Sequence, residues 1–343
     1  MSGSSLDGLD IAYCHFENNN GNWNFEIIKA VTLNFDAQWK QILKNIKNLT
    51  ATETLKYHTL FGKHIGYSVK KFINENGFTP VLISSHGHTV FHNPAQGYTF
   101  QLGHGQAIAT TSGITTVSDF RIKDIIAGGE GAPLVPIGDL MLFPQYEYCL
   151  NLGGIANISF QKDGKRIGFD ICPANQLLNY LSRQLGKPYD INGNFAQLGK
   201  MHKPLFDKLN ETEFYKLEYP KSLSNEYIEN NFFEILDSFA VPVEDKLYTT
   251  VKHIAFQINR VIENRPKGEI LVTGGGAHNI FLINALRFEK GLKFVVPENN
   301  IVNFKESLIF ALMGILRLEN KINCLSGVTG ASIDTSAGTL YYP

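Results

Sequence analysis

Three glycine-bearing turns have the composition that phosphate binding requires: GSSLDG at residues 3–8, NLGGIAN at 151–157 and TGGGAHN at 273–279. Glycine allows close approach and positive φ, so such turns can direct backbone N–H groups at phosphate oxygens. The third turn lies between a predicted strand and a predicted helix, whose N-terminus can also hold an anion. Any one of these turns is more often only a tight turn, and no Walker A motif or strict G-x-G-x-x-G is present.

A histidine group follows a short apolar run in the first half of the chain. His86, His88 and His92 have the spacing H-x-H-x-x-x-H, which could gather a metal ion together with Asp119. No carboxylate or cysteine joins them at a local ligand spacing. We therefore favour hydrogen-bonded histidines that line a cleft, and a zinc hydrolase remains the alternative.

Charged residues that follow predicted strands are candidates for catalysis. Arg121, Lys123 and Asp124 could orient a substrate, or could form a surface salt-bridge group of little energetic weight. Asp170 lies at the end of the strand pattern IGFDI, and a carboxylate at a strand end in a cleft can be desolvated, which raises its pKa. From the residues alone, Asp170 is equally well a general base or a structural cap.

The overall composition is that of a globular enzyme with a small-molecule partner. At 343 residues the chain favours two domains, and a net charge of −1 disfavours nucleic acid or an anionic membrane as partner. Its four cysteines form no C-x-x-C pair, and the first residues have neither a cationic nor an apolar targeting region. We expect a protein of the cytoplasm.

Hydrophobic periodicity in the first half predicts a hairpin followed by a long helix. Two strand patterns, Leu9–Phe16 and Trp23–Leu33, flank the turn NNNGN. A helical pattern between Thr50 and Gly77 begins with a capping box, because Glu53 stands three residues after Thr50. The glycine-rich AGGEGAPLVP then predicts a domain boundary, with domains 1–135 and 136–343 and with the last segment packing back on the first domain.

The second half again begins with strands and ends with helices. EYCLNLGGIANISFQ and IGFDI predict three strands, and GEILVT predicts a fourth. Apolar spacing predicts helices over 249–265, from Asn279 onward, and over 306–318. The two halves suggest a duplicated α/β unit.

Eight colinear segments resemble the anhydro-N-acetylmuramic acid kinase family of the actin and hexokinase superfamily. They are MSGSSLDGLD, SHGHTVFH, DFRIKDIIAGGEGAPLVP, NLGGIANIS, GFDICPAN, GKPYDINGNFAQLGK, VTGGGAHN and VTGA. The resemblance implies two ribonuclease-H-like domains with an active-site cleft between them, which close on ATP and Mg²⁺. It implies a sugar kinase that opens the 1,6-anhydro ring with water and phosphorylates the released 6-hydroxyl, in peptidoglycan recycling. It also implies a homodimer.

The resemblance also implies roles for individual residues. Asp170 matches the family's base and Glu306 a second carboxylate of the cleft, while Asp7 would contact Mg²⁺. The residues implied in phosphate and ATP binding are Gly3, Ser4, Ser5, Asp7, Gly8, Asn151, Gly153, Gly154, Asn157, Gly274, Gly275, Gly276 and Asn279. Those implied in sugar binding are His86, His88, Arg121, Lys123 and Asp124.

Departures from the family's pattern lie mostly on the sugar side. GPGN is replaced by Cys172-Pro173-Ala174-Asn175, HGQT by HGHT, GGQG by GGEG and PKSTGRE by PKSLSNE. A kinase of a related amino sugar is therefore an alternative, and a non-kinase actin-like ATPase of the chaperone type is another. Family members usually have several residues ahead of MSG that complete a first strand, so we expect anchoring of the first phosphate loop to depend on such a strand.

Overall fold

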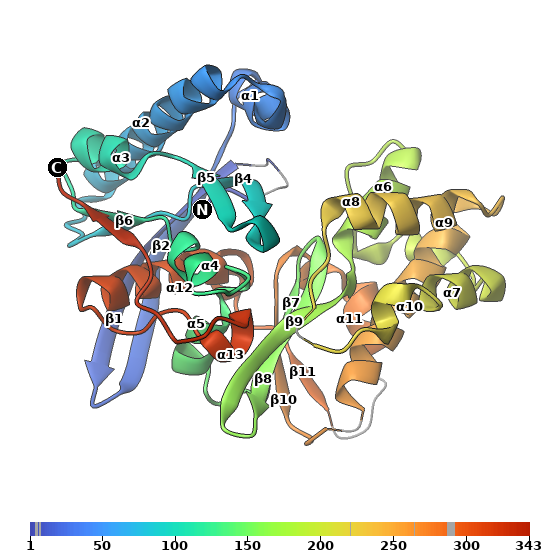
Figure 1. Ribbon diagram of the computed structural model, residues 1–343. Coiled ribbons are helices and arrows are strands. Elements are labelled where there is room, and N and C mark those ends of the chain that lie inside the picture. Colours follow the sequence, from blue (N-terminus) through green and yellow to red (C-terminus); the bar gives the residue numbers. More distant parts are fainter. Residues whose placement is uncertain (4–5, 7, 220, 264, 287–291) are drawn as a thin grey trace. The chain divides into compact units, whose positions relative to one another are not determined.

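The computed structural model describes residues 1–343 except 4–5, 7, 220, 264 and 287–291 (Figure 1). The chain divides into two compact units. Unit 1 contains Met1–Leu142 and Phe304–Pro343, and unit 2 contains Phe143–Asn303. The sequence predicted a boundary after residue 135, whereas the units divide after Leu142 and the chain re-enters unit 1 at Phe304.

Unit 1 opens with the predicted hairpin, whose strands are β1 (Gly8–Asn19) and β2 (Asn22–Asn34). Asn20 and Gly21 both have positive φ, 54° and 93°, as a tight turn that follows the twist of the strands requires. The Oδ1 of Asn18 accepts a hydrogen bond from the N–H of Gly21 over 2.8 Å. The sequence NNNGN therefore forms the turn that its residue types predict.

The first long helix also forms where the sequence predicts it. Helix α2 (Ala51–Asn76) starts at Thr50, whose hydroxyl accepts the N–H of Glu53 while the Glu53 carboxylate accepts the N–H of Thr50. It ends at Gly77, which has the left-handed conformation that glycine adopts without strain. Phe61, Ile65 and Phe72 face the core of unit 1.

The rest of unit 1 is mixed α/β. Strands β3 (Ile83–Ser84), β6 (Thr116–Ser118) and β12 (Thr339–Tyr341) form one sheet in the order β12-β6-β3. Strands β4 (His88–Asn93) and β5 (Tyr98–Leu102) form a hairpin. The helices are α1 (Ala37–Asn45), α3 (Gly105–Ser112), α4 (Ile122–Ile126), α5 (Pro136–Leu142), α13 (Ser326–Thr329) and, from Phe304 onward, α12 (Asn299–Leu318).

Unit 2 is built on a five-stranded sheet with the order β11-β10-β7-β8-β9. The strands are β7 (Tyr148–Leu152), β8 (Ile155–Lys162), β9 (Lys165–Pro173), β10 (Glu269–Thr273) and β11 (Lys293–Val295). β7, β8 and β9 are antiparallel neighbours, whereas β10 is parallel to β7 and β11 is parallel to β10. This is the strand order of a ribonuclease-H-like domain, and it confirms the predicted α/β fold class.

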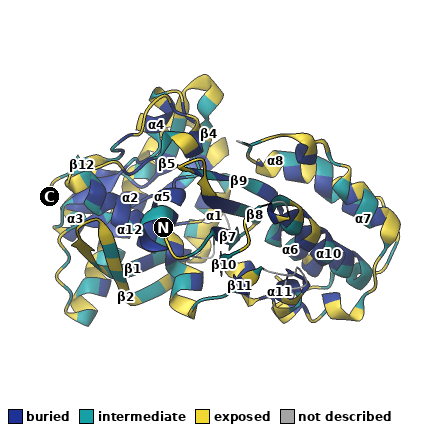
Figure 2. Cartoon of the chain, turned by 90° about the horizontal axis from the view of Figure 1, so that it is seen from below, coloured by how far each residue is buried: buried dark blue, intermediate teal, exposed yellow. Residues whose placement is uncertain are grey.

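Helices cover the sheet of unit 2 and supply its core. They are α6 (Asn175–Gln184), α7 (Lys203–Asn210), α8 (Asn225–Ile228), α9 (Glu234–Asp237), α10 (Val243–Ile262) and α11 (Ile280–Leu286). Much of α10 is buried (Figure 2), because Leu247, Val251, Ile254 and Ile258 recur at helical spacing and are all inaccessible to solvent. Among the described residues, no helix is long and apolar enough to cross a membrane.

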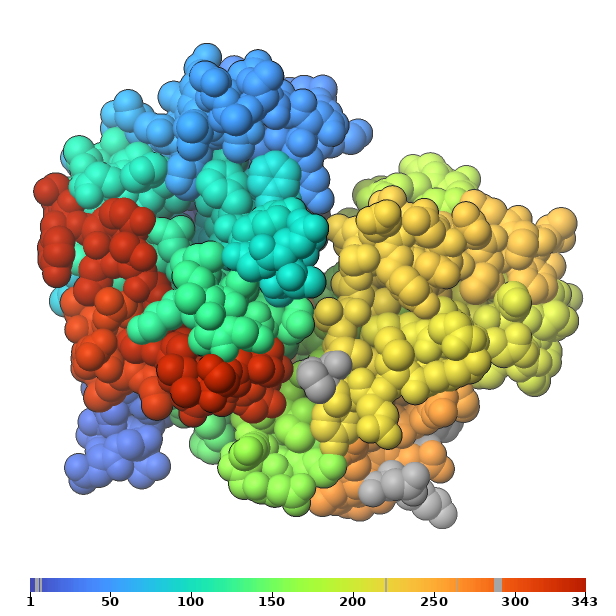
Figure 3. Space-filling view, viewed as in Figure 1, coloured from blue at the N-terminus to red at the C-terminus, as the bar shows by residue number. Residues whose placement is uncertain are grey.

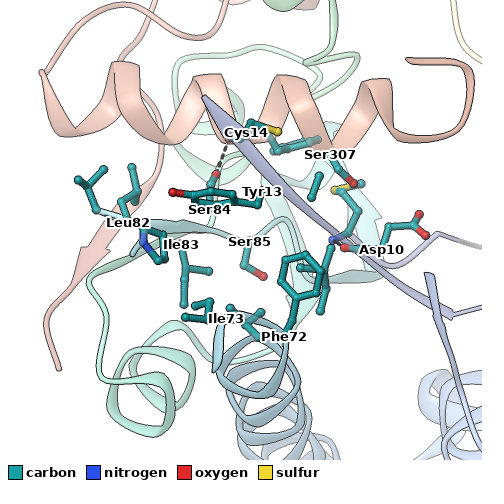
Figure 4. Close-up of a pocket in the computed structure, with 18 of the residues that line it drawn as sticks. Asp10, Tyr13, Cys14, Phe72, Ile73, Leu82, Ile83, Ser84, Ser85 and Ser307 are labelled. Carbon is teal, nitrogen blue, oxygen red and sulfur yellow. Dashed lines mark hydrogen bonds between the residues drawn. The ribbon is translucent and has the colours of Figure 1, made fainter. Parts of the chain in front are cut away.

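A cavity of about 440 Å³ lies inside unit 1, between β1 and β3 (Figure 4). Phe72 and Ile73 of α2 line one side of it, and α12 contributes Phe310 and Ala311. Cys14 lines the cavity, and burial raises the pKa of its thiol to about 12. Among the described strands, β1 pairs only with β2 and β3 only with β6, so both strand edges at this cavity lack a strand partner.

Candidate functional site

Two of the predicted phosphate turns lie side by side in unit 2. β7 and β10 are parallel neighbours with Asn151 opposite Thr273, so both strands end at the same edge of the sheet. NLGGIAN contains the end of β7, the turn at Gly153 and Gly154, and the start of β8, and the single-turn helix η7 (Gly275–His278) of TGGGAHN follows β10. The carboxyl edge of parallel strands is where α/β folds usually bind ligands.

The contact between these turns requires glycine. Gly274 has φ 82°, and a Cβ there would lie 2.5 Å from the Oδ1 of Asn151 and 2.9 Å from the carbonyl oxygen of Leu152. A Cβ on Gly276 would lie 2.8 Å from the Cβ of Leu152. Gly275 is exposed, and a Cβ there would have the Nδ2 of Asn175 as its nearest neighbour, at 3.7 Å. The two turns are thus packed together while the backbone at Gly275 is open to a ligand.

The start of α6 fastens the first of these turns. The N–H of Asn175 donates to the carbonyl of Gly153 over 3.2 Å, and its Nδ2 donates to the carbonyl of Leu152 over 3.0 Å. The N–H of Ala174 donates to the carbonyl of Gly154 over 2.8 Å. These hydrogen bonds fix the backbone of the turn, so its other N–H groups are already oriented before a ligand binds.

Asn279, the last predicted residue of the third turn, is buried. Its Oδ1 accepts the N–H of Leu282 over 3.0 Å and so satisfies one of the free N–H groups at the beginning of α11. The structure gives Asn279 a capping contact, and its contribution to ATP binding stays a prediction.

Asp170 lies on β9 directly opposite Asn157 of β8, so the sheet brings two predicted site residues together. Its Oδ2 accepts the N–H of Leu223 over 2.9 Å, and its own N–H donates to the carbonyl of Lys221 over 3.1 Å. Burial raises the pKa of the Asp170 carboxyl to about 6, and the bond from Leu223 opposes that shift. A carboxylate with a pKa near neutrality is suited to general-base catalysis.

In unit 1, Arg121 and His86 contact one another. The Nε of Arg121 donates to the Nε2 of His86 over 2.9 Å, and its guanidinium also donates to the carbonyl of Gly131 over 2.7 Å. Burial, and next the charge of Arg121, hold the pKa of His86 well below its usual value. His86 is therefore a neutral acceptor at physiological pH.

Glu306 lies on α12 in unit 1. Its side chain is solvent-accessible, yet the protein around the carboxyl raises its pKa through desolvation, while Arg121 and the terminal ammonium act in the opposite direction. The preceding Lys305 forms a buried ion pair with Asp139 of α5, with N and O 2.6 Å apart. This pair fixes the turn of α12 that carries Glu306.

The three histidines of the H-x-H-x-x-x-H group have separate partners. His88 Nδ1 lies 3.1 Å from the hydroxyl of Ser2, and His92 Nδ1 lies 3.0 Å from the hydroxyl of Thr99. Within the part of the chain that the structure describes, no three His, Cys, Asp or Glu residues are grouped to hold a metal ion. The geometry gives no support to a zinc hydrolase.

Lys123 and Asp124 belong to α4, and this green part of the chain lies beside the red C-terminal segment of unit 1 in Figure 3. The Nζ of Lys123 donates to the carbonyl of Ser336 over 2.8 Å. Asp124 has no exposed surface, and its carboxylate accepts the hydroxyl of Thr329 over 2.7 Å and the N–H of Gly131 over 2.8 Å. Both side chains therefore have structural contacts, and sugar binding by them stays a prediction.

Only part of the first predicted phosphate loop can be placed. Gly3 is exposed, and Gly8 is buried at the start of β1, where a Cβ would lie 2.5 Å from the carbonyl oxygen of Leu33. Ser4, Ser5 and Asp7 lie outside the described residues, so the predictions of phosphate and Mg²⁺ binding on them stay untested.

The sequence did not point to three residues that support the site. Leu223 and Lys221 contact Asp170 through main-chain atoms, which leave no trace in residue type. Asn175 supports the glycine turn through both its side chain and its backbone. Its place after the strand end and its match to the last residue of the family's GPGN were the available signals.

Comparison with known proteins finds similar proteins along the whole chain. The family model described as anhydro-N-acetylmuramic acid kinase matches residues 1–343. The anhydro-N-acetylmuramic acid kinase of Vibrio cholerae is 33% identical over 366 residues, which cover 100% of this chain and 97% of that protein. The one from Aliivibrio fischeri is 34% identical over 370 residues, which cover 99% and 97%.

Among solved structures, the activator of the 2-hydroxyisocaproyl-CoA dehydratase from Clostridium difficile, with bound ADPNP, matches with a TM-score of 0.39 and 12% identity. The match covers 73% of this chain and 80% of that one. A likeness of this size carries no argument about function.

Proposed function

This chain belongs to the anhydro-N-acetylmuramic acid kinase family, and we propose that it converts 1,6-anhydro-N-acetylmuramic acid, ATP and water into N-acetylmuramic acid 6-phosphate and ADP. In this reaction water attacks the anomeric carbon, the bond from that carbon to O6 breaks, and O6 takes the γ-phosphoryl group. The proton of the water passes to a base.

The observation that carries the proposal is the environment of Asp170. The carboxylate is half-buried on β9, and its pKa of about 6 leaves it deprotonated but basic at neutral pH. The N–H of Leu223 holds one oxygen, Oδ2, which leaves Oδ1 to accept a proton from water. The turn NLGGIAN lies at the end of the β7-β8 hairpin, and β8 pairs with β9.

The glycine turns of unit 2 fit a nucleotide phosphate. Gly154 and Gly275 are both exposed, and at Gly275 nothing approaches the position of a Cβ closer than 3.7 Å, so a bound phosphate would meet backbone there. Mg²⁺ bound with the nucleotide would neutralise phosphate charge. We infer that Asp7 contributes to its binding, from the match of GSSLDG to the family's first phosphate loop.

The proposal extends to the setting of the enzyme. We infer that it works in the cytoplasm, where ATP is available, as part of peptidoglycan recycling. We also infer a homodimer, because the family to which the chain belongs forms one. Size-exclusion chromatography with light scattering tests the dimer.

The test of the proposed function is the release of ADP from Mg-ATP in the presence and absence of 1,6-anhydro-N-acetylmuramic acid. The expected product is heavier than the sugar by one HPO₃ group and one water in a mass spectrum. ADP release that depends on a different amino sugar would show that the substrate is wrong. ADP release that no amino sugar accelerates would contradict a sugar kinase.

A further inference from the structure

A short stretch of main chain runs beside Asp170 at the outer edge of β9. The N–H of Asp170 donates to the carbonyl of Lys221, and the N–H of Leu223 donates to the Asp170 carboxylate. The side chain of Leu223 is buried. The segment 221–223 thus holds Asp170 at both its backbone and its carboxylate.

The ammonium of Lys221 ties this segment to the short helix η5 (Glu213–Lys216). Its Nζ donates to the carbonyl of Phe214 over 3.2 Å and lies 4.5 Å from the centre of the Phe214 ring. The side chain is half-buried, and desolvation, followed by the charge of Arg260, lowers the pKa of Lys221. A partly desolvated cation over a ring is held more firmly than one in water.

Helix η5 is itself fixed to α10 by a buried polar chain. The hydroxyl of Tyr215 lies 2.9 Å from the Nε2 of His253, and the Nδ1 of His253 lies 2.9 Å from the Oδ1 of Asn210. Gln257 donates to the same oxygen over 2.7 Å. Tyr215, His253 and Gln257 are buried, and hydrogen-bonded groups in such a setting hold one arrangement, so Phe214 is a rigid anchor for Lys221.

We propose that Lys221 is a positioning residue for Asp170: by binding Phe214, it holds the Leu223 N–H on the carboxylate. The inference rests on the proposed function, because it takes Asp170 as the base. Loss of the Lys221 ammonium frees the segment, weakens the hydrogen bond and leaves the desolvated carboxylate less stabilised as an anion.

Other groups around Asp170 do not substitute for this contact. Cys172, two residues along β9, has its pKa raised by burial and then by Asp170, so it remains a neutral thiol. Burial also raises the pKa of Tyr215 well above its usual value. Arg260 of α10 acts on Lys221. Of Asp170, Cys172 and Tyr215, Asp170 is the group whose pKa lies near neutrality.

The test is the pH dependence of kcat/KM for the sugar in Lys221→Met, which keeps the aliphatic stem and removes the ammonium. The midpoint of the acid limb is expected to move upward by about one pH unit, so that activity falls roughly tenfold at pH 5.5 and little at pH 8.5. KM for ATP stays unchanged. In Lys221→Arg, which retains a cation, the midpoint of the acid limb is expected to stay at its native value. Lys216→Met is the matched control, because Lys216 is an exposed lysine of η5 that pairs with Glu213.

A second measurement keeps this inference separate from the proposed function. The carboxyl carbon of Asp170, followed by ¹³C NMR in the folded protein, reports its pKa without any turnover. An upward shift in Lys221→Met but not in Lys216→Met supports the positioning role, whether or not the sugar is the right substrate. If Lys221→Met leaves the midpoint unchanged in both measurements and only lowers the melting temperature, the positioning role of Lys221 is wrong.

Discussion

The guanidinium of Arg121 donates from Nε to the Nε2 of His86 over 2.9 Å, so that ring nitrogen must be unprotonated. The proton of the neutral ring therefore resides on Nδ1, which lies 3.4 Å from the carbonyl of Gly87. Burial and the charge of Arg121 both lower the pKa of His86. We predict that ¹⁵N NMR will find His86 as the neutral Nδ1–H tautomer from pH 8 down to pH 5.5, and a titration midpoint between pH 6 and 7 would contradict this.

The packing of the two glycine turns predicts unequal effects of two neighbouring substitutions. Gly274→Ala forces a Cβ against Asn151 at a positive φ, so we expect the free energy of unfolding to fall by about 1–3 kcal/mol. Gly275→Ala is the matched control, because its Cβ meets nothing closer than 3.7 Å, and we expect a change within about 0.5 kcal/mol. Urea unfolding measures both, and equal losses would contradict the packing.

The cavity of unit 1 predicts that a further strand can be accommodated beside β1. Met1 and Asp10 exchange both backbone hydrogen bonds, each 2.9 Å long, and Ser2 pairs in parallel with His88. Residues placed ahead of Met1 would therefore continue between β1 and β3. We expect about five added residues with alternating apolar side chains to raise the melting temperature by roughly 3 °C.

A Gly-Ser extension of equal length is the control for that change. It can reach the same place but offers no side chains to the apolar lining of the cavity. If both extended chains melt at the temperature of chain 1–343, the strand does not enter the cavity.

The raised pKa of Asp170 predicts a cost in stability. The folded-state pKa of about 6 exceeds the unfolded value near 3.9, so the folded state binds the proton more tightly. The stabilisation of the folded state by this tighter proton binding is complete below about pH 4 and is lost as the pH rises through 6. At pH 8 we expect Asp170→Asn to be more stable than the native chain, by up to about 3 kcal/mol, and the difference to vanish near pH 4. Urea unfolding at both values measures it, and a less stable variant at pH 8 would contradict the desolvation of Asp170.

Local signals in the sequence predicted the elements that depend on neighbouring residues. The capping box at Thr50 and the stop at Gly77 place α2, and NNNGN places the first hairpin. The helices predicted from 249 and 306 begin earlier, at Val243 and Asn299. Strand β3 is shorter than its apolar run, because only Ile83 and Ser84 pair with β6.

Features of the site that depend on distant parts of the chain were not predictable. Asp170 was identifiable as a carboxylate at a strand end, but its partner Leu223 lies 53 residues away and acts through a backbone N–H. The packing of Gly274 on Asn151 depends on β10 lying next to β7, which no residue type specifies. The histidines suggested a common site by their spacing, yet His88 and His92 bond to different partners.

The most direct test of the central claim compares sugar-dependent ADP release by the native chain and by Asp170→Asn at pH 8. We predict that the variant binds ATP with nearly native affinity but turns over slower by a factor on the order of 10³, because the water loses its base. In the native chain, kcat/KM should rise with pH through about 6, since the Asp170 carboxyl must lose its proton to act. Turnover by Asp170→Asn at the native rate would contradict the assignment of Asp170 as the catalytic base.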